Sequence, residues 1–170
     1  MKFIIPRYAK SAATLLALSG DKLILDKPSE LGPLDPQWSS ESGGTFSPLS
    51  IPKTIEFLDE MEKKLSPTSR IIEILSQNLD FEKMGVYKAS LEYAIQPLED
   101  VLTSRMFAAK NNGKKKASQV AKHLITGYPQ HGYPIGLSEA SKLGLEIERI
   151  PADEWRLVWS IYQIFEKNYL

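Results

Sequence analysis

A serine and an aspartate near the start of the chain have the types and spacing that nucleophilic chemistry needs. Ser11 lies in the segment IPRYAKSAATLLAL (5–18), where a short apolar run changes into a helical pattern, and Asp35 lies in LGPLDPQ (31–37), one predicted strand further on. A serine in the first turn of such a helix is held rigidly, and the adjacent amide of Ala12 can donate to a developing oxyanion. A serine at a helix start can also serve as an N-cap alone. The serine and the following carboxylate together indicate the layout of a serine hydrolase site.

The general base of such a site would be a histidine, and the chain has two. His123 lies within a predicted helix, where it is more simply explained as a surface or packed residue. His131 lies in the loop segment GYPQHGYPI (127–135), among turn residues and aromatics, and binding and catalytic groups gather in such loops. Ser11, His131 and Asp35 would have to converge, because a carboxylate must orient the second nitrogen of the histidine. Asp35 lies between two prolines and can also be a residue that shapes a tight turn.

The composition predicts one globular domain over 1–170. The formal net charge is zero, so no general electrostatic footprint indicates nucleic acid or an anionic membrane. The chain has no cysteine, which excludes disulfides, thiolate metal sites and a cysteine nucleophile and fits a cytoplasmic location. No apolar run reaches the roughly 18 to 20 residues that span a bilayer, so we expect a soluble chain. Phosphate-binding glycine loops, dinucleotide fingerprints and metal-ligand clusters are not found, so no cofactor or metal is predicted.

The elements that surround the serine form a compact pattern. Residues 3–5 and 23–25 are predicted strands buried on both faces, and residues 9–19, rich in alanine and leucine, are a predicted helix. Strand, helix and strand in this order predict a parallel βαβ unit over 1–37. Residues 38–50 are rich in serine and glycine and predict an exposed loop.

The remaining residues, 51–170, are predicted to be mostly helical. The predicted elements are helices at 51–65, from Ser66 through 75, at about 80–109 with a kink at Pro97, at 117–125 and at 138–143, a strand at 145–147, and a last helix from Pro151. The predicted fold class is α/β, with a short parallel core followed by a helical carboxy-terminal half. Three lysines at 114–116 predict a solvated helix start and no nucleic-acid partner. Aromatic residues at helical spacing within 155–165 predict a core or oligomer contact.

Two segments resemble one protein family. Residues 6–37 resemble the nucleophile region of the serine dehydrogenase proteinase family, archaeal-type relatives of ClpP and of the signal peptide peptidase SppA, and HGYPIGLSEASKLGLEIERIP (131–151) is similar to that family's carboxy-terminal segment. The resemblance implies a ClpP/crotonase-like fold and a serine peptidase acting on peptide or protein substrates. It also implies a triad in the order Ser11, Asp35, His131.

The resemblance leaves alternatives open. SppA uses a lysine as the base, and Lys10 is adjacent to Ser11, although neighbouring side chains at a strand end tend to point apart. Family members have an amino-terminal half with further strands and a glycine-rich second oxyanion donor, and longer members look membrane-anchored through it. We therefore expect a partial fold: a fragment, a short form that borrows strands, or a catalytically silent subunit acting in oligomerisation. An unpaired strand edge at 3–5 predicts a homo-oligomer.

Overall fold

The chain divides into two compact units. In the computed structural model the described residues are 1–39, 43–64, 77 and 81–169. The first unit comprises Met1–Leu34 and Ile95–Leu170, and the second comprises Asp35–Ala94. The helix α4 (Phe81–Ser104) continues from the second unit into the first.

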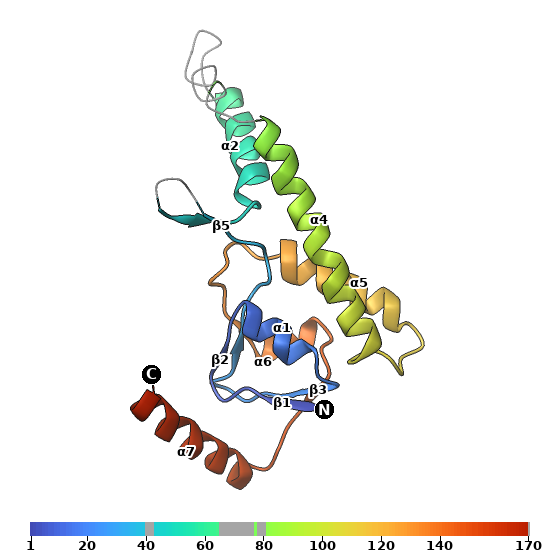
Figure 1. The fold of residues 1–170 in the computed structure, drawn as a ribbon, viewed down its shortest axis with the longest axis vertical. Coiled ribbons are helices and arrows are strands. Elements are labelled where there is room, and N and C mark those ends of the chain that lie inside the picture. Colours follow the sequence, from blue (N-terminus) through green and yellow to red (C-terminus); the bar gives the residue numbers. More distant parts are fainter. Residues whose placement is uncertain (40–42, 65–76, 78–80, 170) are drawn as a thin grey trace. The chain divides into compact units, whose positions relative to one another are not determined.

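The elements follow the chain as shown in Figure 1. The first unit contains β1 (Lys2–Ile4), β2 (Tyr8–Ala9), α1 (Ala12–Leu18), β3 (Lys22–Ile24), β4 (Glu30–Leu31), the last part of α4, α5 (Gly113–Thr126), β7 (Ile135–Gly136), α6 (Leu137–Lys142), β8 (Ile147–Glu148) and α7 (Ala152–Tyr169). The second unit contains β5 (Trp38–Ser39), β6 (Thr45–Phe46), α2 (Ser50–Lys64) and the first part of α4.

A parallel sheet in the order β1, β3, β8 confirms the predicted βαβ unit and the α/β class. Phe3 lies opposite Leu23, and Leu23 lies opposite Ile147. The connection from β1 to β3 includes α1, and a Cβ on Gly20, just past that helix, would lie 2.7 Å from the Phe3 ring. Residue 20 must therefore be small for the helix to lie this close to the sheet.

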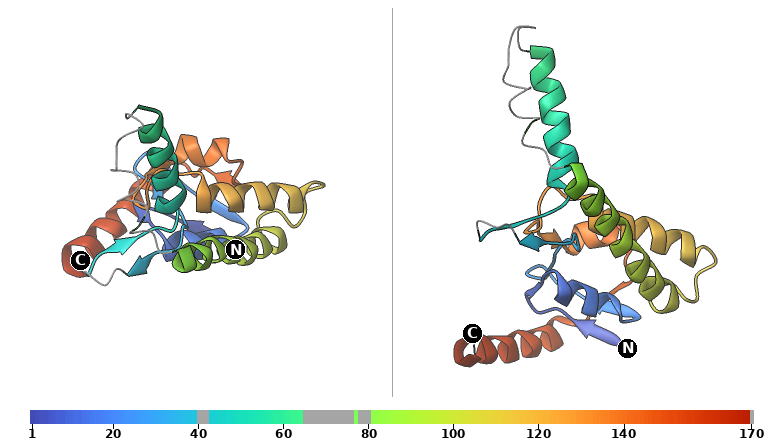
Figure 2. Two further views of the ribbon diagram at one scale, coloured as in Figure 1. Left: turned by 90° about the horizontal axis from the view of Figure 1, so that it is seen from above. Right: turned by 45° about the horizontal axis from the view of Figure 1, so that its top comes forward.

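The strand β1 differs from its prediction because it is an edge strand and is not buried on both faces. Its Ile4 side chain is 44% exposed. α7 lies on the side of the strands away from α1 (Figures 1 and 2), but it leaves a hollow of about 330 Å³, lined by Ile4, Pro6 and the α7 residues Val158, Ile161, Tyr162 and Phe165. An ion pair of 2.7 Å between Arg7 Nη1 and Glu166 Oε1 ties α7 to the segment after β1.

The helix predicted at 9–19 is shorter in the structure, because its first residue belongs to a second small sheet. The strand order of this sheet is β2, β4, β7. Ala9 is a strand residue that pairs with Leu31 in parallel, so α1 begins at Ala12. On the other side of β4, Leu31 pairs with Ile135 in antiparallel orientation. A two-residue strand carries too little pattern to be detected from the sequence.

The core of the first unit joins both sheets to the helices. Its fully buried large side chains are Leu18, Leu23, Leu25, Leu31, Leu102, Phe107, Leu124, Ile125 and Ile135. The strand predicted at 23–25 is indeed buried, although its last residue lies just beyond β3. The helices predicted at 80–109, 117–125 and 138–143 correspond to α4, α5 and α6, and Pro97 lies inside α4.

In the second unit, residues predicted as an exposed loop form a short hairpin. β5 and β6 pair in antiparallel orientation, with Trp38 opposite Phe46. Both rings meet the Tyr87 ring of α4 edge-on, at centroid distances of 5.1 and 5.3 Å. Contacts between aromatic rings therefore accompany strand pairing of Trp38–Ser39 with Thr45–Phe46, in a region whose serine and glycine content predicts a loop. The helix α2 agrees with the helix predicted at 51–65. The helix predicted from Ser66 through 75 lies outside the described residues.

The helix α7 begins where the sequence predicts a last helix, directly after Pro151. The Pro151 carbonyl accepts a hydrogen bond of 2.9 Å from the Trp155 amide, and acidic residues occupy the first turn. Within the described ranges, no helix combines the length and the apolar composition that crossing a membrane requires.

Substitutions of Leu18 and Leu16, two leucines of α1, test which face of this helix packs against the core. Leu18 is fully buried, so Leu18→Ala should lower the free energy of unfolding by about 2 to 5 kcal/mol. Leu16 is 61% exposed, and Leu16→Ala should change the free energy of unfolding by no more than about 0.5 kcal/mol. Urea denaturation followed by circular dichroism measures both values. Equal losses in the two variants would show that α1 is packed differently.

Candidate active site

Ser11 lies at a sharp turn between β2 and α1, with a backbone conformation that L residues rarely adopt. Its φ is 51° and its ψ is −120°. Among the described residues it is the one non-glycine with a positive φ. Such a conformation costs of the order of 1 to 3 kcal/mol and persists where the surrounding structure enforces it, which occurs most often at functional sites. A strained serine between a strand and a helix is the geometry that exposes a nucleophilic hydroxyl.

The Ser11 hydroxyl does not act as the cap of α1. A capping serine accepts a hydrogen bond from an amide of the first helical turn, and Ser11 makes no such side-chain bond. Ser11 is half-buried, and the next two residues, Ala12 and Ala13, are exposed. The alternative explanation of Ser11 as a simple cap therefore lacks its defining contact, and the two residues of α1 that follow Ser11 have small side chains.

The amide of Ala12 is the backbone donor that directly follows Ser11. The Ala13 amide donates to the Lys10 carbonyl at 3.0 Å, and the Leu15 amide donates to the Ser11 carbonyl at 3.2 Å. For the Ala12 amide, no acceptor occurs in the part of the chain that the structure describes. This amide is directly adjacent to the Ser11 hydroxyl and remains able to donate to a ligand.

The register of the second sheet brings the Ser11 turn and the His131 loop to the same end of β4. β2 runs parallel to β4, so its last residue, Ala9, leads into the turn beside Leu31. β7 runs antiparallel to β4, so the loop that precedes Ile135 arrives at that same end. His131 lies in this loop, four residues before Ile135 along the chain. Two segments far apart in the sequence thus lie at the same end of the sheet, on either side of β4.

His131 is half-buried within a loop that aromatic rings support. The Tyr128 and Tyr133 rings are stacked at 4.8 Å, and the Tyr133 amide donates to the Gln130 carbonyl at 3.1 Å. Burial raises the pKa of Tyr128, and the nearby carboxylate of Glu139 adds to this effect. The second histidine, His123, is an exposed residue in the last turn of α5 and meets Tyr128 edge-on.

Asp35 is the first residue of the second unit and directly follows the chain that leaves β4. The Leu34 amide just before it donates to the Leu124 carbonyl at 2.9 Å. Asp35 is 4% exposed, and its Oδ2 accepts a hydrogen bond of 2.8 Å from Gln37 Nε2. A buried carboxylate of this kind is either a structural acceptor or an orienting group for a base.

Lys10, the alternative base, uses its ammonium group as a donor. Lys10 Nζ donates to Glu30 Oε2 at 2.9 Å and to the Leu31 carbonyl at 3.0 Å. A lysine that acts as a base must instead accept a proton from the serine. These contacts direct the side chain of Lys10 toward β4.

Sequence reasoning missed Thr14, which is buried in α1 three residues after Ser11. Its hydroxyl bonds to the carbonyl of Ala9 and to the amide of Gly32. The one signal in the sequence is a threonine within a helix that otherwise consists of alanine and leucine.

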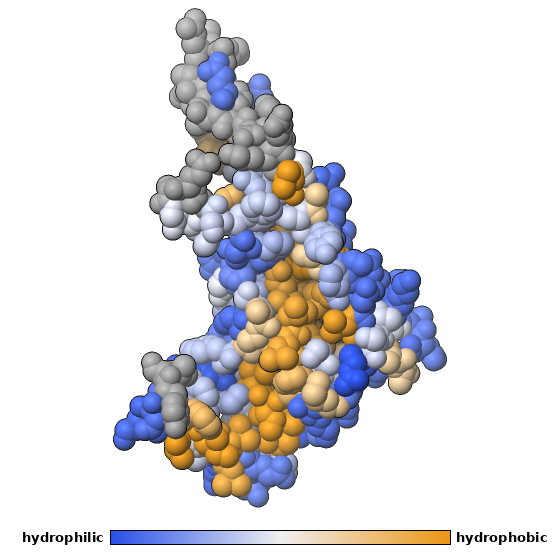
Figure 3. Space-filling view, viewed as in Figure 1, coloured by the Kyte–Doolittle hydropathy of each residue, from blue (hydrophilic) through white to orange (hydrophobic). Residues whose placement is uncertain are grey.

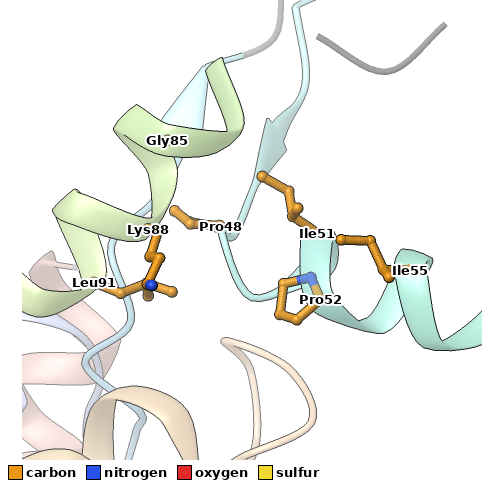
Figure 4. A pocket seen from close by; sticks show the side chains of 7 residues that line it. All are labelled: Pro48, Ile51, Pro52, Ile55, Gly85, Lys88 and Leu91. Atoms are coloured by element: carbon orange, nitrogen blue, oxygen red, sulfur yellow. The ribbon is translucent and has the colours of Figure 1, made fainter. Parts of the chain in front are cut away.

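The second unit has an apolar groove of about 480 Å³ between α2 and α4 (Figure 4). Pro48, Ile51, Pro52, Ile55, Gly85, Lys88 and Leu91 line it. Lys88 is its one charged side chain, so its lining offers no acid–base pair for chemistry.

A model of the protein family described as ClpP-like SDH-type serine proteinase matches residues 1–168. The chain is 30% identical over 162 residues to uncharacterized protein MJ0137 of Methanocaldococcus jannaschii, which is 95% of this chain and 48% of that protein. It is 30% identical over 156 residues to uncharacterized protein MJ1495 of the same organism, which is 91% of this chain and 45% of that protein. The chain therefore spans about half the length of these relatives. No solved structure matches it significantly.

The backbone conformation of Ser11 predicts an unusual order of stability among its variants. Ser11→Gly should be more stable than Ser11→Ala by about 1 kcal/mol, because glycine adopts a positive φ without strain while alanine retains the Cβ. Urea denaturation of both variants measures the difference. Greater stability of the alanine variant would contradict the strained turn.

Proposed function

Since the chain belongs to the ClpP-like SDH-type serine proteinase family, we propose that it carries the nucleophilic centre of a peptidase and that Ser11 is the nucleophile. Family membership confirms the resemblance seen in residues 6–37 and 131–151. The single observation that carries the proposal is the strand-to-helix turn at Ser11, with its positive φ and uncapped hydroxyl.

We propose a Ser11, His131, Asp35 triad for the reaction. His131 takes the hydroxyl proton as the Ser11 oxygen attacks the peptide carbonyl, and the Ala12 amide donates to the oxyanion that forms. His131 then gives the proton to the leaving amine, which leaves an acyl group on Ser11. A water molecule, activated by the same histidine, releases this acyl group as a carboxylic acid. Asp35 holds the imidazole in the required orientation.

His131 is favoured over the other two candidate bases. The sheet register supports its loop as the partner of the Ser11 turn, whereas His123 is exposed on α5. The contacts of Lys10 to Glu30 and Leu31 weigh against a Ser–Lys dyad of the SppA type. A different alternative is a silent subunit that keeps the fold for oligomerisation and has an unreactive Ser11.

We also propose that the chain forms a homo-oligomer, with α7 in the contact. Ile161, Ile164 and Phe165 of α7 are more than half exposed. Apolar residues gather on the face that carries α1 and along α7 (Figure 3). Exposed apolar residues in such number are typical of contact surfaces.

Fluorophosphonate labelling of the purified chain, followed by intact mass, tests the nucleophile. We expect one label on the wild-type chain and none on Ser11→Ala. His131→Ala and Asp35→Asn should lower the labelling rate by about 1000-fold or more, because an unassisted serine is a weak nucleophile.

His123→Ala is the matched control, since it removes the other histidine of the chain, and it should label like the wild type. A label that persists in Ser11→Ala, or an equal loss in both histidine variants, would contradict the assignment. A folded wild-type chain that takes no label would favour the silent subunit.

Sedimentation velocity tests the oligomer. We expect a mass above the 19.1 kDa of the single chain, and Phe165→Ser should shift the distribution toward that mass because it removes apolar contact area. Gln163→Ser, at an exposed polar position of the same helix, should leave the distribution unchanged. A sharp monomer mass at all concentrations would contradict the proposal.

A further inference from the structure

One buried hydroxyl joins the two chain segments that flank the Ser11 turn. Thr14 is fully buried in the first turn of α1. Its Oγ1 donates to the carbonyl of Ala9, the last residue of β2, and accepts a hydrogen bond of 3.0 Å from the amide of Gly32, the first residue after β4. Both partners therefore belong to the backbone that leads into or away from the sheet.

This hydroxyl takes the place of a sheet hydrogen bond. The Glu30 amide donates to the Arg7 carbonyl at 2.6 Å, and in a regular parallel ladder the next bond of this kind would run from the Gly32 amide to the Ala9 carbonyl. Thr14 Oγ1 instead bonds to both groups. The two strands separate at this point while their polar groups remain paired.

The bond to Ala9 also spans the strained turn. A threonine inside a helix commonly bonds to the carbonyl four residues before it, within the helix. Thr14 reaches five residues back, to a carbonyl that precedes the turn. It therefore connects the start of α1 directly to the end of β2, with Ser11 between them.

Gly32 completes the arrangement through a close backbone approach. A Cβ at Gly32 would lie 3.2 Å from the Cα of Lys10, the residue before Ser11. Lys10 is itself held to β4 by its bonds to Glu30 and Leu31. The chain on both sides of Ser11 is thus fixed to the same segment.

We propose that Thr14 is a positioning residue for the nucleophile: its hydroxyl replaces a ladder bond between β2 and β4 and thereby holds Ser11 in its positive-φ conformation. Thr14 is buried and acts through the backbone of the turn. The proposal rests on the proposed function, since positioning matters where Ser11 is the nucleophile.

The test compares Thr14→Val, which removes the hydroxyl and keeps the shape, with Thr14→Ser, which keeps the hydroxyl. Thr103→Val is the matched control, because Thr103 Oγ1 is also buried in a helix of the first unit but has no hydrogen-bond partner among the described residues. Two quantities are measured on the full chain: the fluorophosphonate labelling rate of Ser11, and the hydrogen exchange rate of the Gly32 amide by NMR.

We expect Thr14→Val to lower the labelling rate about 100-fold, as a displaced nucleophile does, and to speed the exchange of the Gly32 amide. Thr14→Ser and Thr103→Val should match the wild type in both measurements. Wild-type labelling in a folded Thr14→Val chain, or unchanged Gly32 exchange, would overturn the proposal. If Thr14→Val does not fold, a folded Thr14→Ser chain that loses labelling or Gly32 protection overturns it equally.

The two readouts separate this proposal from the proposed function. If the folded wild-type chain takes no label, the proposed function is wrong. The positioning role is then wrong as well, even if the exchange rate of the Gly32 amide changes in Thr14→Val. If the wild-type chain is labelled and the Thr14→Val chain is labelled at the same rate, only the positioning role is wrong.

Discussion

The arrangement of the candidate site depends on one residue whose backbone is held where L residues are disfavoured. At φ 51° and ψ −120°, Ser11 turns the chain from β2 into α1, and only Lys10 lies between Ser11 and the last residue of β2. The strain of this conformation must be offset by contacts on either side, and both sides are bonded to the segment around β4. The same turn leaves the Ser11 hydroxyl uncapped and the Ala12 amide without a backbone acceptor among the described residues.

Hydrophobic pattern predicted the parts of the fold that are long or fully apolar. The parallel pairing of β1 with β3 through α1 follows from two apolar runs that flank an alanine-rich segment, and α2, α4 and α6 follow from helical spacing. The pattern failed where an element is short or where a distant contact decides burial. β2 and β7 have two residues each, and the exposure of Ile4 is determined by how α7 lies over it.

The residues chosen from the sequence for chemistry are distributed unevenly over the two units. Ser11 and His131 belong to the first unit, and Asp35 opens the second, immediately after a backbone bond from Leu34 to α5. Residue types and the family resemblance selected these three, but the register that relates the Ser11 turn to the His131 loop is a property of tertiary pairing. The role of Thr14 could not be recognised either, because its partners are backbone atoms of other segments.

The pairing of β4 with β7 has a consequence for how the site is made. Leu31 is synthesised well before Ile135, so the sheet that carries the Ser11 turn cannot be complete until the residues between these two have left the ribosome. The entropy of closing so long a loop must be overcome before the contacts between β4 and β7 can form, which slows this pairing relative to local contacts. The nascent chain therefore lacks the assembled β2, β4, β7 sheet until β7 has emerged.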